Sequence, residues 1–189
     1  MDDVLPFPGP PRVPARLVAA VEAVLFALGS TVKLEQLAAA IPDADLRDLR
    51  DALEVLAVRC GSEERGLVLV EVAGGYQLRT DPRFAEEVAR ATSTKPVKLS
   101  RPALEVLSVI AWEQPVTKGD IDVVRGVDSG GTVRTLLKKG LIRVAGRRDE
   151  PGRPLLYRTT KGFLQLFSLP NIQSLPRLSE AAELTEPVE

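Results

Sequence analysis

Three segments near the start of the chain carry apolar residues at helical spacing. The first predicted helix begins near Ala15 and is placed to end at Gly29, and its inward face consists of Leu17, Val21, Val24, Leu25 and Leu28. A short helix is expected at about 33–40. A longer one starts at Asp43 or Asp45, either of which can cap it, and its core face consists of Leu46, Leu49, Leu53 and Leu56. Two strand-like runs around Gly74-Gly75 then predict a hairpin.

The same order of elements is predicted again in the second half of the chain. Ser100 can cap a helix that ends at Pro115, and its inward face consists of Leu104, Leu107, Ile110 and Ala111 or Trp112. Thr117 to Asp120 has the form of a capping box for a short helix that Gly126 closes. A third helix starts at Asp128 or Ser129 and ends at Gly140, with an apolar face formed by Val133, Leu136 and Leu137.

Two strands around Pro151-Gly152 and a last helix complete the second half of the chain. Thr160 caps this helix, which runs through Phe167. The two halves align at one offset, because Val32 and Leu37 correspond to Val116 and Ile121. Sequence identity between the halves is thin, so the repeat is architectural.

Three helices followed by a two-stranded wing form the winged variant of the helix-turn-helix. The predicted fold class is therefore mainly α with small β wings (α+β), arranged as two tandem winged-helix domains. The N-terminal domain covers 14–81, a linker with a short helix covers 82–98, and the C-terminal domain covers 99–170. Residues 1–13, rich in proline, are predicted to be a disordered arm, and residues 171–189 a disordered acidic tail.

Charge changes this picture, because the near-zero net charge of −1 conceals an asymmetry. Residues 1–94 carry 10 basic and 15 acidic side chains, residues 95–174 carry 14 and 7, and residues 175–189 carry 1 and 4. An excess of basic side chains on one domain indicates either a nucleic-acid surface or a patch for an acidic protein.

Candidate chemistry is scarce. The chain has no His and a single Cys, so it lacks the commonest general base and can form no intramolecular disulfide. Cys60 ends an apolar helix and is interpreted as a structural thiol. The stretch GVDSGGT lacks the lysine of a phosphate-binding loop. The sequence therefore predicts no enzyme, no metal site and no cofactor. Its longest apolar run is too short for a membrane span, and we expect a cytoplasmic protein.

Nucleic-acid binding is the main alternative in the second domain. Its third helix and wing carry exposed cations that could contact DNA, namely Arg134, Lys138, Arg147, Arg148 and Arg153. That helix begins with Gly130 and Gly131, which have no groups to discriminate bases. The equivalent helix of the first domain carries Asp48, Asp51 and Glu54, which repel phosphate. A solvated face is the alternative explanation for the basic set.

Specific motifs in the second half resemble a known family. AWEQPVTKGDIDVVRGVDSGGTVRTLLKKGLI followed by GRRDEPGRPLLYRTTKGFLQLFSL resembles segregation and condensation protein B, and LVAAVEAVLFALGSTVKLEQLAAAI resembles the family's N-terminal unit more loosely. The resemblance implies a tandem winged-helix homodimer that binds a kleisin subunit (segregation and condensation protein A) and, through it, an SMC ATPase. It implies a non-enzymatic scaffold in chromosome condensation and segregation, with weak or indirect DNA contact. The alternative is a winged-helix DNA-binding transcriptional regulator.

Two sets of residues are candidates for the protein contacts that this resemblance implies. The last helix of the second domain is apolar on several sides, and the kleisin-binding set is Tyr157, Phe163, Leu164 and Phe167. The alternative is that these residues close the core of their own domain. Val18 and Phe26 lie off the inward face of the first helix and form the dimerisation set.

Overall fold

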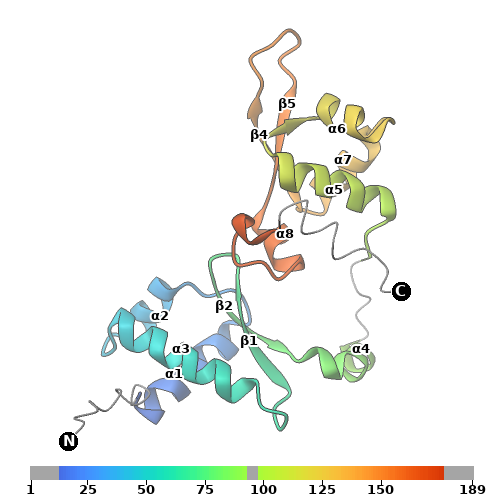
Figure 1. The fold of residues 1–189 in the computed structure, drawn as a ribbon. Helices are drawn as coiled ribbons and strands as arrows, with labels where there is room; N and C mark the ends of the chain where they lie inside the picture. Colours follow the sequence, from blue (N-terminus) through green and yellow to red (C-terminus); the bar gives the residue numbers. More distant parts are fainter. Residues whose placement is uncertain (1–12, 93–97, 177–189) are drawn as a thin grey trace, which may run out of the picture. The chain divides into compact units, whose positions relative to one another are not determined.

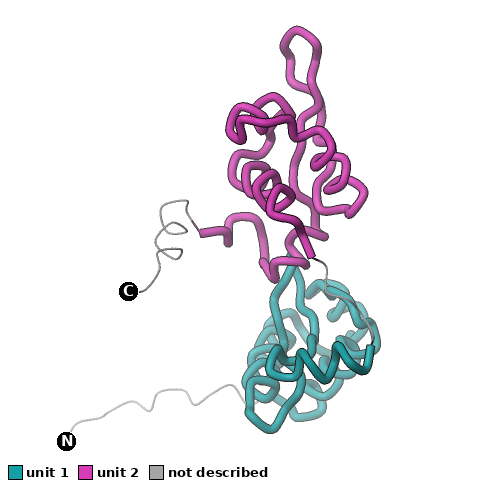
Figure 2. Tube along the Cα trace, turned by 90° about the vertical axis from the view of Figure 1, so that its right-hand side faces the viewer, with its two compact units in different colours: residues 1–95 teal, residues 96–189 magenta. Residues whose placement is uncertain are grey.

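The computed structural model describes residues 13–92 and 98–176. The chain divides into two compact units, residues 1–95 and 96–189 (Figure 2), and the division falls inside the linker predicted at 82–98. Each unit has its own hydrophobic core. The fold is α+β, with small sheets added to helical cores, as expected from the sequence.

Unit 1 contains three helices and a hairpin, in the predicted order (Figure 1). The helices are α1 (Ala15–Leu28), α2 (Leu34–Ala40) and α3 (Leu46–Cys60), and the antiparallel strands are β1 (Leu67–Val72) and β2 (Gly75–Thr80). Asp45 caps α3, because its carboxylate accepts hydrogen bonds from the N–H groups of Arg47 and Asp48, both at 2.7 Å. A 3-10 turn (Pro82–Phe84) and α4 (Ala85–Thr92) follow the hairpin.

The hairpin turn lies one residue earlier than predicted. Ala73 and Gly74 are the turn residues and have φ values of 53° and 75°, whereas Gly75 begins β2. Gly75 is instead required by a close approach of the backbone. Val32 and Tyr76 exchange two backbone hydrogen bonds of 2.8 Å, and a Cβ on Gly75 would lie 2.6 Å from the carbonyl oxygen of Val32. The segment before α2 is thereby bridged to the hairpin.

The buried face of α1 differs from the predicted one. Val18, Val21 and Leu25 are fully buried, whereas Leu28, predicted to face inward, is exposed. Leu28 is the last residue of the helix, where no described residue of the core packs against it. Leu46 is exposed for the equivalent reason, because it is the first residue of α3.

Unit 2 repeats the arrangement with a more complete sheet. Its helices are α5 (Arg101–Glu113), α6 (Lys118–Arg125), α7 (Gly130–Lys138) and α8 (Lys161–Leu166). The strands are β3 (Val116–Thr117), β4 (Ile142–Arg147) and β5 (Leu155–Thr159), with β5 in the centre of an antiparallel sheet. Predicted caps are present at Ser100, Thr117 and Thr160, whose hydroxyl groups each accept a backbone N–H three residues on.

The sequence correspondence between the halves has a structural counterpart. Val116 pairs with Tyr157 in unit 2 in the way that Val32 pairs with Tyr76 in unit 1. Leu37 and Ile121, the other matched pair, are both fully buried. The two units therefore use the same residue positions to join the segment before the second helix to the second strand of the wing.

The β4–β5 hairpin extends beyond the helices of its unit (Figures 1 and 2). Its turn contains Gly152 and Arg153, with φ values of 85° and 42°. The predicted wing strands and the turn at Pro151-Gly152 are confirmed. The short strand β3 was missed because a two-residue strand has no periodicity that sequence can reveal.

The predicted disordered tail begins too early. Ile172–Ser174 forms a 3-10 turn, Ile172 and Leu175 pack against the core of unit 2, and the indole N–H of Trp112 donates to the carbonyl oxygen of Pro176 at 3.0 Å. Residues 177–189 of the predicted tail and residues 1–12 of the predicted arm lie outside the described residues.

The two glycines Gly75 and Gly131 should respond oppositely to alanine. Gly75→Ala should lower the free energy of unfolding by about 1–3 kcal/mol, because its methyl group meets the backbone of Val32. Gly131→Ala, on α7 with open space around it, should raise it by up to about 1 kcal/mol through helix propensity. Urea denaturation followed by circular dichroism measures both. An unchanged midpoint for Gly75→Ala would mean that the bridge to Val32 contributes little.

Candidate interaction surfaces

A small apolar groove lies between α5, α8 and the segment that follows α8. Its volume is about 100 Å³, and it is lined by Leu104, Leu107, Ser108, Ala111, Trp112, Phe163, Phe167 and Leu175. The rings of Phe163 and Phe167 contact each other, with centroids 4.9 Å apart and tilted by 43°. Leu104 and Phe167 are the most exposed of its hydrophobic residues, at 42% each. The groove thus presents apolar surface next to an aromatic ring that its own unit does not cover.

The structure separates the four residues of the predicted kleisin-binding set. Tyr157 is 8% exposed and Phe163 is 3% exposed, and both belong to the core of unit 2. Leu164 is half-buried against the same core. Phe167 is the one member of the set that is exposed. The correction follows from the sheet: Tyr157 is on the central strand β5, flanked by Val116 and Val144, and so faces the helices.

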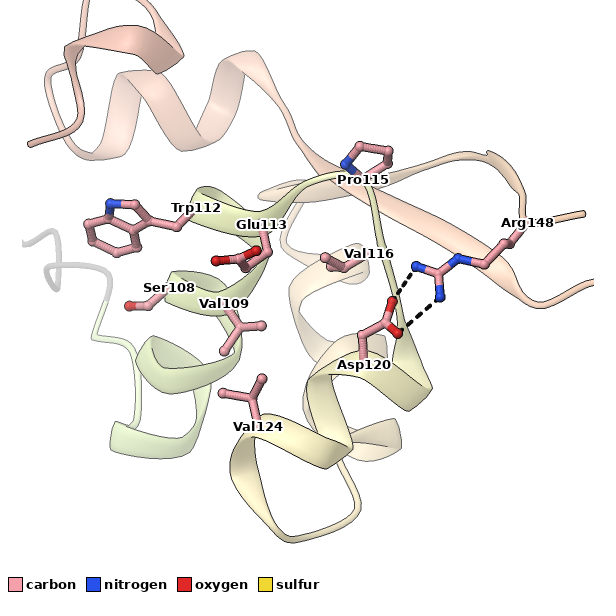
Figure 3. A pocket seen from close by; sticks show the side chains of 9 residues that line it. All are labelled: Ser108, Val109, Trp112, Glu113, Pro115, Val116, Asp120, Val124 and Arg148. Carbon is pink, nitrogen blue, oxygen red and sulfur yellow. Dashed lines mark hydrogen bonds and ion pairs between the residues drawn. The ribbon is translucent and has the colours of Figure 1, made fainter. Parts of the chain in front are cut away.

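A larger cavity of about 470 Å³, not anticipated from the sequence, lies between α5 and α6. Figure 3 shows its lining: Ser108, Val109, Trp112 and Glu113 come from α5, Val124 comes from α6, and the paired Asp120 and Arg148 lie at one end. Val123 and Val124 are exposed residues of α6. Their position on the solvent face of a helix is a sequence signal that could have indicated this surface.

Asp120 and Arg148 form an ion pair at one end of this cavity. Nη1 and Nη2 of Arg148 donate to Oδ1 and Oδ2 of Asp120 at 3.0 and 2.5 Å, and the N–H of Thr117 donates to Oδ2 at 2.8 Å. These hydrogen bonds lower the pKa of Asp120 to about 2, and the bonding to Arg148 has the largest effect. Arg148 is therefore held by a carboxylate, which corrects its assignment as a DNA-contacting residue.

The remaining basic candidates are exposed. Arg134 and Lys138 lie on α7, Arg147 on β4 and Arg153 in the wing turn. The part of the chain that the structure describes offers none of them an ion-pair partner. Their exposure agrees with the sequence analysis, and their contact with DNA stays a prediction.

The predicted dimerisation set is also separated. Val18 is fully buried in the core of unit 1, so it cannot contact a second copy. Phe26 is 72% exposed and lines a groove of about 250 Å³ between α1 and the β1–β2 hairpin. The groove is lined by Ala19, Glu22, Ala23, Phe26, Leu67 and Leu78.

The described residues offer no arrangement typical of catalysis. Cys60 is buried, and burial raises the pKa of its thiol, so the thiolate nucleophile is disfavoured. Within residues 13–92 and 98–176, no three His, Cys, Asp or Glu side chains come together in a way that could hold a metal ion. The same ranges contain no helix long and apolar enough to span a membrane.

Comparison with known proteins gives consistent matches along most of the chain. The family model described as "Segregation and condensation complex subunit ScpB" matches residues 19–178. Segregation and condensation protein B of Syntrophotalea carbinolica is 53% identical over 173 residues, which covers 90% of this chain and 86% of that protein. The Moorella thermoacetica protein of the same name is 41% identical over 172 residues, which covers 90% and 87%.

Among solved structures, one is described as a dimer of the ScpB N-terminal domain complexed with an ScpA peptide. It is 34% identical, covers 40% of this chain and 94% of that chain, and has a TM-score of 0.38.

Replacing Asp120 should change how stability depends on pH. Because the folded-state pKa of Asp120 is lowered, the stability that it contributes is present above its unfolded pKa, near 4, and is lost as the pH falls towards 2. Asp120→Asn should lower the free energy of unfolding by about 1 kcal/mol at pH 6, a modest amount because the carboxylate is partly exposed. At pH 2 the substitution should leave the free energy of unfolding unchanged. Thermal unfolding between pH 6 and 2 measures this. Asp149→Asn, in the same wing and without an ion pair among the described residues, is the control. If Asp120→Asn were still less stable than the wild type at pH 2, the ion-pair explanation would be wrong.

Proposed function

Because the chain belongs to the segregation and condensation complex subunit ScpB family, we propose that it acts as a scaffold subunit of a condensin-like complex. In this proposal the chain is not an enzyme. It binds a kleisin subunit as a homodimer and thereby joins an SMC ATPase, in the cytoplasm at the nucleoid, where the complex condenses and segregates chromosomes. The observation that carries the proposal is the family match, which spans both units.

The kleisin contact is assigned to the α5–α8 groove of unit 2. An amphipathic helix binds by laying apolar side chains at helical spacing into such a groove. Phe167 and Leu104 provide exposed apolar surface at its rim, and Trp112 lines it. Phe163 contributes indirectly, because its buried ring contacts the ring of Phe167 and supports it at the rim of the groove. The contact is mostly apolar and so should depend weakly on salt.

The dimer contact is assigned to the exposed face of α1. A homodimer with two-fold symmetry uses the same patch on both copies, so Phe26 of one copy can enter the α1–hairpin groove of the other. Burying a ring that is 72% exposed provides hydrophobic free energy of about 2 kcal/mol per copy. Leu28, also exposed near the end of α1, extends the apolar patch.

The alternative function, a transcriptional regulator that reads DNA sequence, is not favoured by the helices that would read it. In unit 2, α7 begins with two glycines, and in unit 1, α3 exposes Asp48 and Glu54. Neither helix offers an array of side chains that could identify bases in the major groove.

Phe167→Asp should weaken kleisin binding by thirtyfold or more, a loss of about 2 kcal/mol that is typical of a central aromatic contact. Its effect on folding should be modest because Phe167 is partly exposed. Isothermal titration of the purified kleisin measures the affinity. Leu166→Asp is the matched control: it is similarly exposed on the same helix end but lines a different groove.

Affinity capture of the tagged chain from nuclease-treated cytoplasm tests the function as a whole. The kleisin and the SMC ATPase should remain bound to the wild-type protein and be lost with Phe167→Asp. If neither is retained by the wild-type protein, the scaffold proposal is wrong; if Leu166→Asp loses them equally, the groove assignment is wrong.

Phe26→Asp should shift the protein from dimer to monomer at micromolar concentration, because each interface would then bury two additional charges. Light scattering coupled to size exclusion measures the mass. Val58→Asp introduces the same charge at a more exposed apolar position on α3 and should leave the dimer intact. A wild-type protein that is monomeric in this concentration range would refute the assignment of α1 to a dimer interface.

A further inference from the structure

The cations of unit 2 fall into two classes according to their partners. On α5 and α6, every Lys or Arg has a carboxylate partner: Nε of Arg101 lies 3.3 Å from Glu105, Nη2 of Arg125 lies 2.9 Å from the same side chain, and Lys118 pairs with Asp122 and Asp128. The charges of these two helices are thus largely balanced within the unit.

The segment from Gly130 to Lys161 is different. It contains nine Lys and Arg residues and only two acidic residues, Asp149 and Glu150. Within the described residues, Arg148 is the only one of the nine that forms an ion pair. The other eight, called the wing cations below, are all exposed: Arg134, Lys138, Lys139, Arg143, Arg147, Arg153, Arg158 and Lys161.

Intramolecular contacts of the wing cations leave their charge uncompensated. Nε of Arg134 donates to the carbonyl oxygen of Gly130 at 3.2 Å, and Nη1 of Arg147 donates to that of Arg153 at 2.9 Å. These bonds orient the guanidinium groups against the backbone but supply no negative charge. Because both side chains are exposed, their remaining N–H donors can form hydrogen bonds to an anion.

Two of the wing cations lie so close together that their like charges destabilise the fold. Arg143 on β4 lies directly opposite Arg158 on β5, and cross-strand partners project from the same face of a sheet. Like charges in this position are destabilising. An anion bound between the two guanidinium groups would convert the repulsion into two charge-assisted hydrogen bonds.

The distribution of the wing cations favours an extended polyanion over a small one. They lie on α7, along both strands of the hairpin, in its turn and at the start of α8, and the hairpin itself extends beyond the helices (Figures 1 and 2). From Arg143 to Arg147 the strand alone covers about 13 Å, which is the spacing of several DNA phosphates rather than the size of one anion.

The composition of this surface favours a nucleic acid over an acidic protein. Stable protein interfaces need a buried apolar or aromatic centre. Among the residues of α7, β4, the turn and β5, the one large hydrophobic residue that is exposed is Val144. A surface rich in Arg and Lys without an apolar anchor is the pattern of phosphate-backbone recognition.

We propose that the wing cations of unit 2 form a binding surface for the phosphate backbone of double-stranded DNA, with no base-specific contact. Sequence discrimination is absent because α7 begins with Gly130 and Gly131, and because Arg148 is engaged by Asp120. This inference does not depend on the scaffold function, since the wing cations lie outside the residues that line the α5–α8 groove.

The experiment is a titration of a short fluorescent duplex with the full chain, followed by anisotropy at several salt concentrations. Wild-type affinity should fall steeply with salt. Replacing both Arg143 and Arg158 by Gln should reduce the log–log salt slope by about 1.8, because two phosphate contacts are removed. The double variant should unfold at the same or a higher temperature than the wild type, since a repulsive pair is lost. The matched control Arg101→Gln removes a paired cation of α5 and should leave the slope unchanged.

Four further outcomes decide the proposal. Duplexes with permuted sequences should bind equally, and a tenfold preference among them would overturn the absence of base contacts. Poly-glutamate that binds as tightly as DNA would overturn the assignment to nucleic acid. An unchanged slope in the Arg143 and Arg158 double variant would overturn the surface itself. DNA binding should persist in Phe167→Asp, which distinguishes failure of this surface from failure of the kleisin contact.

Discussion

The carboxylate of Asp120 links the helices of unit 2 to its wing. Asp120 accepts hydrogen bonds from the backbone of Thr117, where β3 meets α6, and from the guanidinium of Arg148, just after β4. It therefore caps α6 and at the same time holds the end of β4 that lies next to the hairpin turn. In the sheet of this unit β5 lies between β3 and β4, and Tyr157 on β5 is buried in the core.

The charge distribution of unit 2 follows from how its carboxylates are used. Glu105, Asp120 and Asp128 pair with cations from other segments of the unit, and Asp122 pairs with Lys118 within α6. Arg125, for example, is largely buried while it joins α6 to Glu105 of α5. Few carboxylates remain for α7 and the distal wing, which keep a strong positive field. The same acidic residues that stabilise the helices thus leave the wing available to an external polyanion.

Local signals in the sequence were sufficient to predict most helices and strands, but not which faces of these elements are buried. The ends of the helices could be predicted because capping and terminating residues act on their immediate neighbours. Examples are the N-caps Asp45, Ser100 and Thr160 and the terminating glycines Gly29 and Gly126. Burial depends on what packs from elsewhere in the chain. Val18 was assigned to the surface although β2 and α3 contact α1, and Tyr157 and Phe163 were assigned to a partner although the sheet and α5 cover them. The large cavity beside Asp120 was missed because its walls come from three separate segments.

The repeated architecture explains why the two units can differ in what they contact. Each unit closes its core with the same elements, so the exposed positions of the third helix are free to vary. In α3 these positions include Asp48 and Glu54, and in α7 they include Arg134 and Lys138. Exposed aromatic residues occur elsewhere, at Phe26 on α1 and at Phe167 after α8. Apolar contacts respond weakly to ionic strength and phosphate contacts respond strongly. If the wing cations bind DNA as proposed, a change in ionic strength would release the DNA while the apolar contacts to protein partners persist.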